Sequence, residues 1–300
     1  MERRHVGLLL VGVAAMSSSA VLVRLAGDAE VPSLAIAFYR VALASAVLLP
    51  IAWLRHRAEI RALTRDRWHL ALLSGTALGL HFSTWIPSIE LTSVAASAVL
   101  VQTTPIWVAL LARFVGERPT RRTMLGIGLA IAGVLVISGG GFGSGGRALL
   151  GNALALAGAA FGAIYLLFGR NLRRSMSVAT YAAIVYSTAS AVLATAMIVS
   201  GTPFAGFAPE AWALFAAMTV GPQFLGHTVF NELLGHLRAT VVSIALLAEP
   251  VGATTLAWIV LDEAPTAPTL VGGGVVLIGV FIAMRAEAAR VPEVLSQPPE

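Results

Sequence analysis

Long apolar runs with almost no charge recur along this 300-residue chain and decide what it can fold into. A run of about 17 to 25 mostly apolar residues is long enough for a helix to cross a membrane. Candidate spans lie at 6–25, 33–54, 69–88, 92–114, 122–138, 148–169, 176–200, 211–230, 239–261 and 268–285. Lipid offers no partner to an exposed amide, and these runs are continuous rather than alternating, so helices are expected. The pattern predicts an all-α integral membrane protein with ten transmembrane helices.

Composition agrees with a largely lipid environment. Hydrophobic residues make up 57% of the chain and charged residues only 12%, which is too few polar groups to cover a water-soluble domain. Cysteine is absent, which excludes disulfides, thiolate catalysis and cysteine-ligated metals. The 20 basic residues are all arginine and lie between the apolar runs, so they indicate membrane orientation rather than nucleic-acid binding.

The arginines set the expected orientation of the spans. Cytoplasmic loops are enriched in basic residues, and a cytoplasmic N-terminus places nearly all the arginines on that side. The second connection carries Arg55, Arg57, Arg61, Arg65 and Arg67, and the fourth carries Arg113, Arg118, Arg121 and Arg122. The outer connections carry Asp28, Glu30, Glu210, Asp262 and Glu263. We therefore expect a multi-pass protein of the plasma membrane with both termini in the cytoplasm.

The sequence matches itself when it is shifted by 146 residues. At this offset the block 117–123 falls on 263–269, with the pattern E-x-P-T in both, and His81 falls on His227. Each half holds five spans, an odd number, so the second half enters the membrane from the opposite side. Inverted repeats of this kind are a recurrent device of secondary transporters.

This repeat divides the chain into four parts. The expected parts are a first five-helix repeat at 1–138, a glycine-rich linker at 139–147, a second five-helix repeat at 148–285 and a polar C-terminal tail at 286–300. The first span is matched by the sixth, so it belongs to the repeat and is not a cleaved signal peptide.

Strongly polar side chains inside the spans are few and mark the candidate site. A charge at the centre of a bilayer costs about 2.5–3.5 kcal/mol on insertion scales, so such groups face a cavity or a partner. The candidates for lining a substrate cavity are His81, Trp85, Gln102, Tyr165, His227, Asn231 and Glu249. Imidazole, indole and amide groups suit a zwitterionic or aromatic solute. The alternative is that the histidines hydrogen-bond neighbouring helices and fix their packing.

Glu249, which precedes Pro250 in the ninth span, is the candidate for proton coupling. His81 and His227 are further titratable candidates. Glu249 could instead pair structurally with an arginine such as Arg40. Arg40 could also snorkel to the outer headgroups or hold a substrate carboxylate. The sequence assigns no role to Glu232.

The motifs expected of an enzyme are missing. The chain contains neither H-E-x-x-H nor G-x-S-x-G, so no catalytic residue, metal site or cofactor is expected, and an intramembrane enzyme is a distant alternative. A channel would more usually build its pore from several subunits. The expected partners are a small-molecule substrate, membrane lipid and protons, with a homodimer as one option and no nucleic acid.

Two blocks carry a family resemblance. These are TSVAASAVLV…GERPT…LGIGLAIAGV in the first half and ATVVSIALLAEPVG…DEAPT…VGGGVVLIGV in the second. They resemble the two EamA-type repeats of the drug/metabolite transporter (DMT) superfamily, and the resemblance covers 6–285.

The resemblance implies a central cavity lined chiefly by spans 1, 3, 4, 6, 8 and 9, which carry the candidate residues. It also implies alternating-access export of amino acids or related small metabolites, with protons as one coupling option. Uptake or exchange of another small solute is the alternative. Glu232 departs from the pattern, because similar sequences have an aromatic or other apolar residue after the position of Asn231.

Overall fold

The computed structural model describes residues 2–92, 97, 100–112, 119–137, 145–262 and 264–289. Within these ranges the chain forms helices and no strands. Six stretches of the described chain are long and apolar enough to cross a membrane on their own: Arg3–Asp28, Ser33–Ala62, Gly146–Arg173, Val178–Ser200, Ala239–Val260 and Ala267–Glu287. The chain is therefore an all-helical membrane protein with several spans.

The helices follow the predicted spans in order. The first half contains α1 (Arg3–Asp28), α2 (Ser33–Ala62), α3 (Arg65–Leu91), α5 (Thr104–Ala112) and α6 (Arg121–Ile137). The second half contains α7 (Gly146–Arg173), α8 (Val178–Ser200), α9 (Pro209–Met218), η2 (Thr219–Thr228), α10 (Val229–Leu234), α11 (Ala239–Leu246), α12 (Glu249–Leu261) and α13 (Ala267–Ala288). Residues 113–118, 138–144, 263 and 290–300 lie outside the described part, and with them Glu117, Glu263, most of the glycine-rich linker and most of the tail.

Two predicted spans are broken where a continuous helix was expected. The α-helical hydrogen bonding is interrupted at Gln102 and Thr103 before α5, and again at Leu247 and Ala248 between α11 and α12, where the backbone keeps α-helical angles but forms tighter bonds to the residue three positions earlier. A proline lies in the first turn after each break, Pro105 in α5 and Pro250 in α12. Proline lacks an N–H and suits the start of a helix, so a new helix begins at each of these points.

The predicted span 211–230 is also irregular. It consists of α9, the π-helix η2 and α10, which follow one another without a loop. Pro222 lies inside η2, where its missing N–H removes one hydrogen bond of the α-helical ladder. The π-helix is rare in proteins, and where it occurs it is frequently at a functional site. The equivalent stretch of the first half lies inside the regular helix α3.

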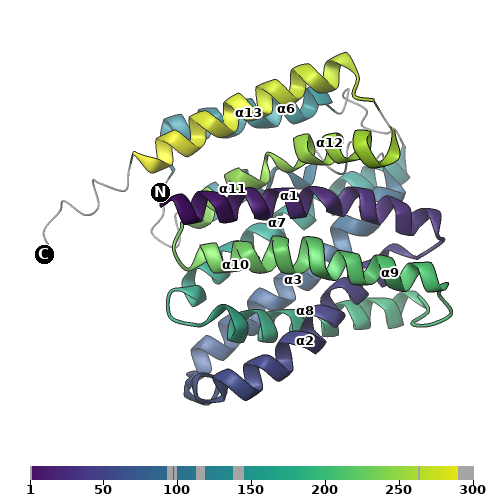
Figure 1. The fold of residues 1–300 in the computed structure, drawn as a ribbon, viewed down its shortest axis with the longest axis vertical. Helices are drawn as coiled ribbons and strands as arrows, with labels where there is room; N and C mark the ends of the chain where they lie inside the picture. Colours follow the sequence, from purple (N-terminus) through teal and green to yellow (C-terminus); the bar gives the residue numbers. More distant parts are fainter. Residues whose placement is uncertain are drawn as a thin grey trace, which may run out of the picture.

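The helices of the two halves pack on each other rather than forming two separate bundles. At one edge of the molecule α6 runs alongside α13, and towards the opposite edge α2 packs on α8 (Figure 1). Between these edges α3 packs on α7, and α1 packs on η2 and α12. The interior of the protein is thus formed by contacts between the first and second halves.

Glycines bring α6 and α13 into backbone contact. A methyl group built at Gly126 would lie 2.7 Å from the carbonyl oxygen of Gly279, and one built at Gly133 would lie 2.7 Å from that of Gly272. Residue numbers rise along one helix as they fall along the other, so the two helices are antiparallel. Small residues allow such close approach between membrane helices.

Candidate functional site

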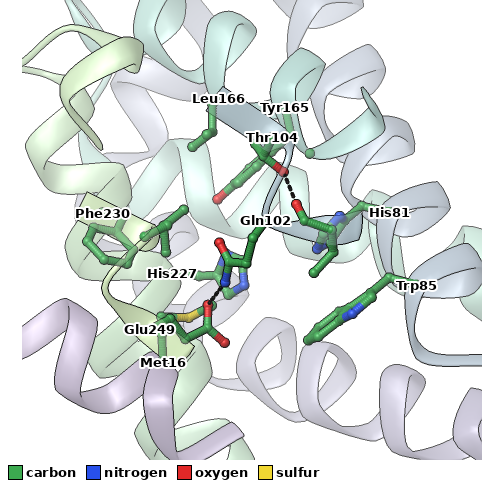
Figure 2. Close-up of a pocket in the computed structure, with 13 residues that line it drawn as sticks. Met16, His81, Trp85, Gln102, Thr104, Tyr165, Leu166, His227, Phe230 and Glu249 are labelled. Carbon is green, nitrogen blue, oxygen red and sulfur yellow. Dashed lines mark hydrogen bonds between the residues drawn. The ribbon is translucent and has the colours of Figure 1, made fainter. Parts of the chain in front are cut away.

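A cavity of about 60 Å³ lies where helices of both halves meet the two broken spans (Figure 2). This volume has room for a few water molecules. Its walls come from α1, α3, α7, η2, α10 and the residues on either side of the two breaks. The lining residues are Met16, His81, Trp85, Val101, Gln102, Thr104, Gly162, Tyr165, Leu166, His227, Phe230, Leu246 and Glu249.

The cavity brings together six of the seven residues that the sequence singles out as a substrate site. His81, Trp85, Gln102, Tyr165, His227 and Glu249 all line it. Asn231 does not line it: this residue is fully buried behind Tyr165, whose hydroxyl donates a 2.5 Å hydrogen bond to Asn231 Oδ1. Residues from spans 3, 4, 6, 8 and 9 therefore converge on one space.

Gln102 and Glu249 join the two halves across this space. Gln102 Nε2 donates to Glu249 Oε2 at 3.3 Å. Gln102 lies in the break before α5, and Glu249 is the first residue of α12 after the second break. The Ser17 hydroxyl lies 3.2 Å from the backbone carbonyl oxygen of Glu249 and can donate to it, which ties α1 to the same point.

His81 has both of the roles that the sequence left open. Its Nδ1 donates to the carbonyl oxygen of Gly158 on α7 at 2.7 Å, and its ring stacks on Trp85 with 5.6 Å between ring centroids. Gly158 and Gly162 make room for this packing, since a methyl group at Gly162 would lie 3.1 Å from His81 Nδ1. The same ring also forms part of the cavity wall.

His227 is held mainly by ring contacts. Its ring packs edge-on against Phe82 with 5.3 Å between centroids, and Tyr165 lies 6.1 Å away. Its Nε2 is buried, and no partner for this atom occurs among the residues that the structure describes. The same holds for Trp85 Nε1. Two nitrogen atoms beside the cavity are thus left for a solute or water, because buried polar groups normally have a partner.

Arg40 is fully buried, which favours structural pairing over snorkelling to the outer headgroups, two of the alternatives that the sequence left open. Its Nε donates to Gln223 Oε1 and its Nη1 to the Ser19 hydroxyl, both at 3.2 Å. Its guanidinium carbon lies 4.6 Å from the centre of the Phe82 ring. Arg40 therefore pairs with neutral groups and a ring, one layer behind the cavity wall.

Sequence reasoning missed Gln223 and Tyr186. Gln223 is a strongly polar residue inside the predicted span 211–230, so the rule that found the other candidates applies to it equally. Tyr186 gives no such signal, since tyrosine is common in membrane helices. It accepts a 3.2 Å hydrogen bond from Asn231 Nδ2, a contact that only the fold reveals.

Glu232 faces away from the cavity and closes an ion pair at the end of α10. Its Oε2 lies 2.6 Å from Nη2 of Arg173, which is 6% exposed. Arg173 Nε also donates to the carbonyl oxygen of Asn231 at 2.9 Å. His236 lies 3.4 Å from the other carboxylate oxygen. Glu232 thus fastens α10 to the end of α7.

Comparison with known proteins identifies relatives of this chain. Two proteins of Archaeoglobus fulgidus, each named "Uncharacterized transporter", are similar to the chain: one is 25% identical over 264 residues, covering 85% of this chain and 89% of the relative. The other is 29% identical over 206 residues, covering 64% and 68%. A solved structure described only as "Crystal structure of protein" has the same fold, with a TM-score of 0.81, 18% identity and coverage of 97% and 100%. The model of the EamA-like transporter family matches 4–139 and 149–285, and the chain belongs to this family.

Proposed function

We propose that this transporter exports amino acids or related small metabolites across the plasma membrane by alternating access, in exchange for protons. The observation that carries the proposal is the contact between Gln102 and Glu249. Two helices, one from each half, are broken at the cavity and present these side chains to each other. Discontinuous helices that meet between repeats are typical of substrate sites in secondary transporters.

Equivalent contacts support ten spans in two inverted repeats. The 146-residue offset places Gly12 on Gly158 and Thr84 on Phe230. A methyl group at Gly12 would lie 2.8 Å from Phe230, and one at Gly158 would lie 3.2 Å from the Thr84 hydroxyl. The same contact is thus made twice with the halves exchanged. Together with the antiparallel pair α6 and α13, this favours a twofold relation between the halves.

Export would follow from exchange of conformation between the halves. A solute would enter the cavity when contacts between the halves open on one side. Glu249 is the proposed coupling group, with His81 and His227 as secondary candidates. A proton and a solute amino group are alternative partners for one carboxylate, so the arrival of one releases the other. Import or exchange of another small solute is the alternative.

The test is transport by the purified protein in liposomes. Uptake of a panel of labelled amino acids is measured with and without a pH gradient for wild type, Glu249→Gln and Glu210→Gln. Glu210 is an exposed carboxylate at the start of α9 and serves as the matched control. We expect saturable, gradient-dependent flux that Glu249→Gln abolishes and Glu210→Gln retains. Gradient-dependent flux that survives in Glu249→Gln would remove the coupling role.

A further inference from the structure

The direction of the hydrogen bonds around the cavity bears on which chemical group is recognised there. An ammonium group offers three donors and no acceptor, and a carboxylate offers only acceptors. A wall whose own protons are already donated elsewhere presents lone pairs and therefore suits the ammonium group.

The hydrogen-bond chain behind Tyr165 can be assigned from its far end. A backbone carbonyl can only accept, so the 3.1 Å contact between Thr228 and the Gln223 carbonyl oxygen uses the threonine proton. Tyr186 must then donate to Thr228 at 2.9 Å. Its oxygen accepts from Asn231 Nδ2 at 3.2 Å, which leaves Asn231 Oδ1 to accept from Tyr165. The Tyr165 hydroxyl proton is thus used in the bond to Asn231, and only its lone pairs are left to face the cavity.

Two further wall residues follow the same pattern. His81 Nδ1 donates to the Gly158 carbonyl oxygen, so Nε2 is an acceptor in the neutral ring. The Thr104 hydroxyl donates to the carbonyl oxygen of Val101 at 2.7 Å, which leaves its own lone pairs unused. Neither residue is arranged to donate to a solute.

Glu249 and Gln102 complete the set of acceptors. An ionised carboxylate is an acceptor with two oxygens, and only Oε2 of Glu249 receives the hydrogen bond from Gln102. Gln102 uses one N–H for that bond and keeps its second N–H and its carbonyl oxygen, so it can both donate and accept. The wall also contains apolar side chains, among them Met16, Leu166 and Phe230.

The wall also holds nitrogen atoms that have no partner in the described part of the chain, but they are fewer than the acceptors. Trp85 Nε1 and His227 Nε2 are both enclosed in this conformation. Arg40 carries a positive charge that opposes a cationic solute, but it does not line the cavity and lies behind Phe82. A direct contact with Glu249 outweighs a charge at a longer distance, because Coulomb energy falls with separation.

We infer that the cavity recognises the protonated amine of its solute, held by Glu249, Tyr165 and His81, and that small apolar primary amines without a carboxylate are therefore ligands. This inference rests on the proposed transport function and narrows its substrate class. The carboxylate of an amino acid contributes little to recognition by this arrangement.

The test compares ligands that share one carbon skeleton. Leucine, 3-methylbutylamine and 4-methylpentanoate carry both charged groups, the amine alone and the carboxylate alone. Affinities are taken from thermal stabilisation of the purified protein, and leucine flux is measured in parallel in liposomes. We expect the amine to bind at least as tightly as leucine and about tenfold more tightly than the carboxylate, as loss of one charge-assisted contact implies.

Two variants separate recognition from folding. Tyr165→Phe should weaken amine binding by about threefold to tenfold, and Tyr181→Phe should not, since the Tyr181 hydroxyl contacts Ser74 outside the cavity. Equal or tighter binding of 4-methylpentanoate, or no binding of the amine, would overturn the inference. Leucine flux in the same preparation reports separately on the proposed function, so the two can fail independently.

Discussion

Gln102 and Glu249 touch across the boundary between the two halves, and each stands where a membrane helix is interrupted. Gln102→Leu removes the donor and leaves a half-buried carboxylate with one bond fewer, at a cost of about 1–3 kcal/mol. We expect a lower melting temperature for this variant. The loss should shrink in a Glu249→Gln background, because a neutral amide is easier to bury than a carboxylate. Additive losses in the double-mutant cycle would contradict the coupling.

The contact between α6 and α13 predicts a contrast between two glycines of one helix. Gly279→Val inserts atoms against the backbone of α6, where a methyl group would lie 2.6 Å from the Gly126 carbonyl oxygen. Overpacking of this kind costs about 1–3 kcal/mol. Gly274→Val meets nothing within 4 Å and serves as the control. Melting curves in detergent decide the matter, and equal curves for the two variants would show that α6 and α13 do not pack in this way.

The burial of Arg40 predicts a large loss of stability when it is replaced, although this residue does not line the cavity. Arg40→Ala leaves Gln223 and Ser19 without their partner and removes the cation from Phe82, so we expect a loss of about 1–3 kcal/mol or more. Arg285 also stacks on a ring, that of Phe281 at 5.3 Å, but it is exposed. Arg285→Ala should cost about 1 kcal/mol or less. If unfolding by heat does not distinguish the variants, Arg40 is not part of a structural network.

Glu232 is expected to affect stability without changing solute recognition. Glu232→Gln removes the ionic partner of the largely buried Arg173, which should lower the melting temperature. The half-saturating concentration of a transported solute should stay within about twofold, because Glu232 does not line the cavity. Measurements of flux against solute concentration test this. A large change in that concentration would place Glu232 in the recognition of the solute.

The absence of cysteine makes the proposed orientation directly testable. Single cysteines at Arg147 and Arg57 are each the only thiol in their variant. A membrane-impermeant maleimide added to intact cells should label the cysteine at Arg147, in a proposed outer connection, and should reach the one at Arg57 only after lysis. The reverse pattern would invert the orientation.

The sequence predicts the helices and much of the site for a single physical reason. Polar groups are costly in lipid, so several of the few that occur inside apolar runs lie at one cavity, as His81, Gln102 and Glu249 do, while others such as Arg40 pair with one another away from it. The breaks beside Gln102 and Glu249 could not be predicted from the sequence. Proline alone does not mark a break, because neighbouring groups in a membrane protein can satisfy the backbone atoms that it leaves without a partner. The burial of Arg40 depends on Gln223, which lies 183 residues further along the chain. Such distant partners leave no trace in local periodicity.

The π-helix η2 gives the eighth span a property that the third span lacks. A π turn holds more residues than an α turn, so its ten residues are wound more loosely than those of α3. Rewinding η2 into an α-helix would lengthen the span and swivel α10 about its own axis relative to α9. His227 lies within the part that rewinds, so this swivel would carry one wall of the cavity with it. The eighth span can therefore change its length by rewinding a segment, which the regular helix α3 at the equivalent place in the first half does not offer.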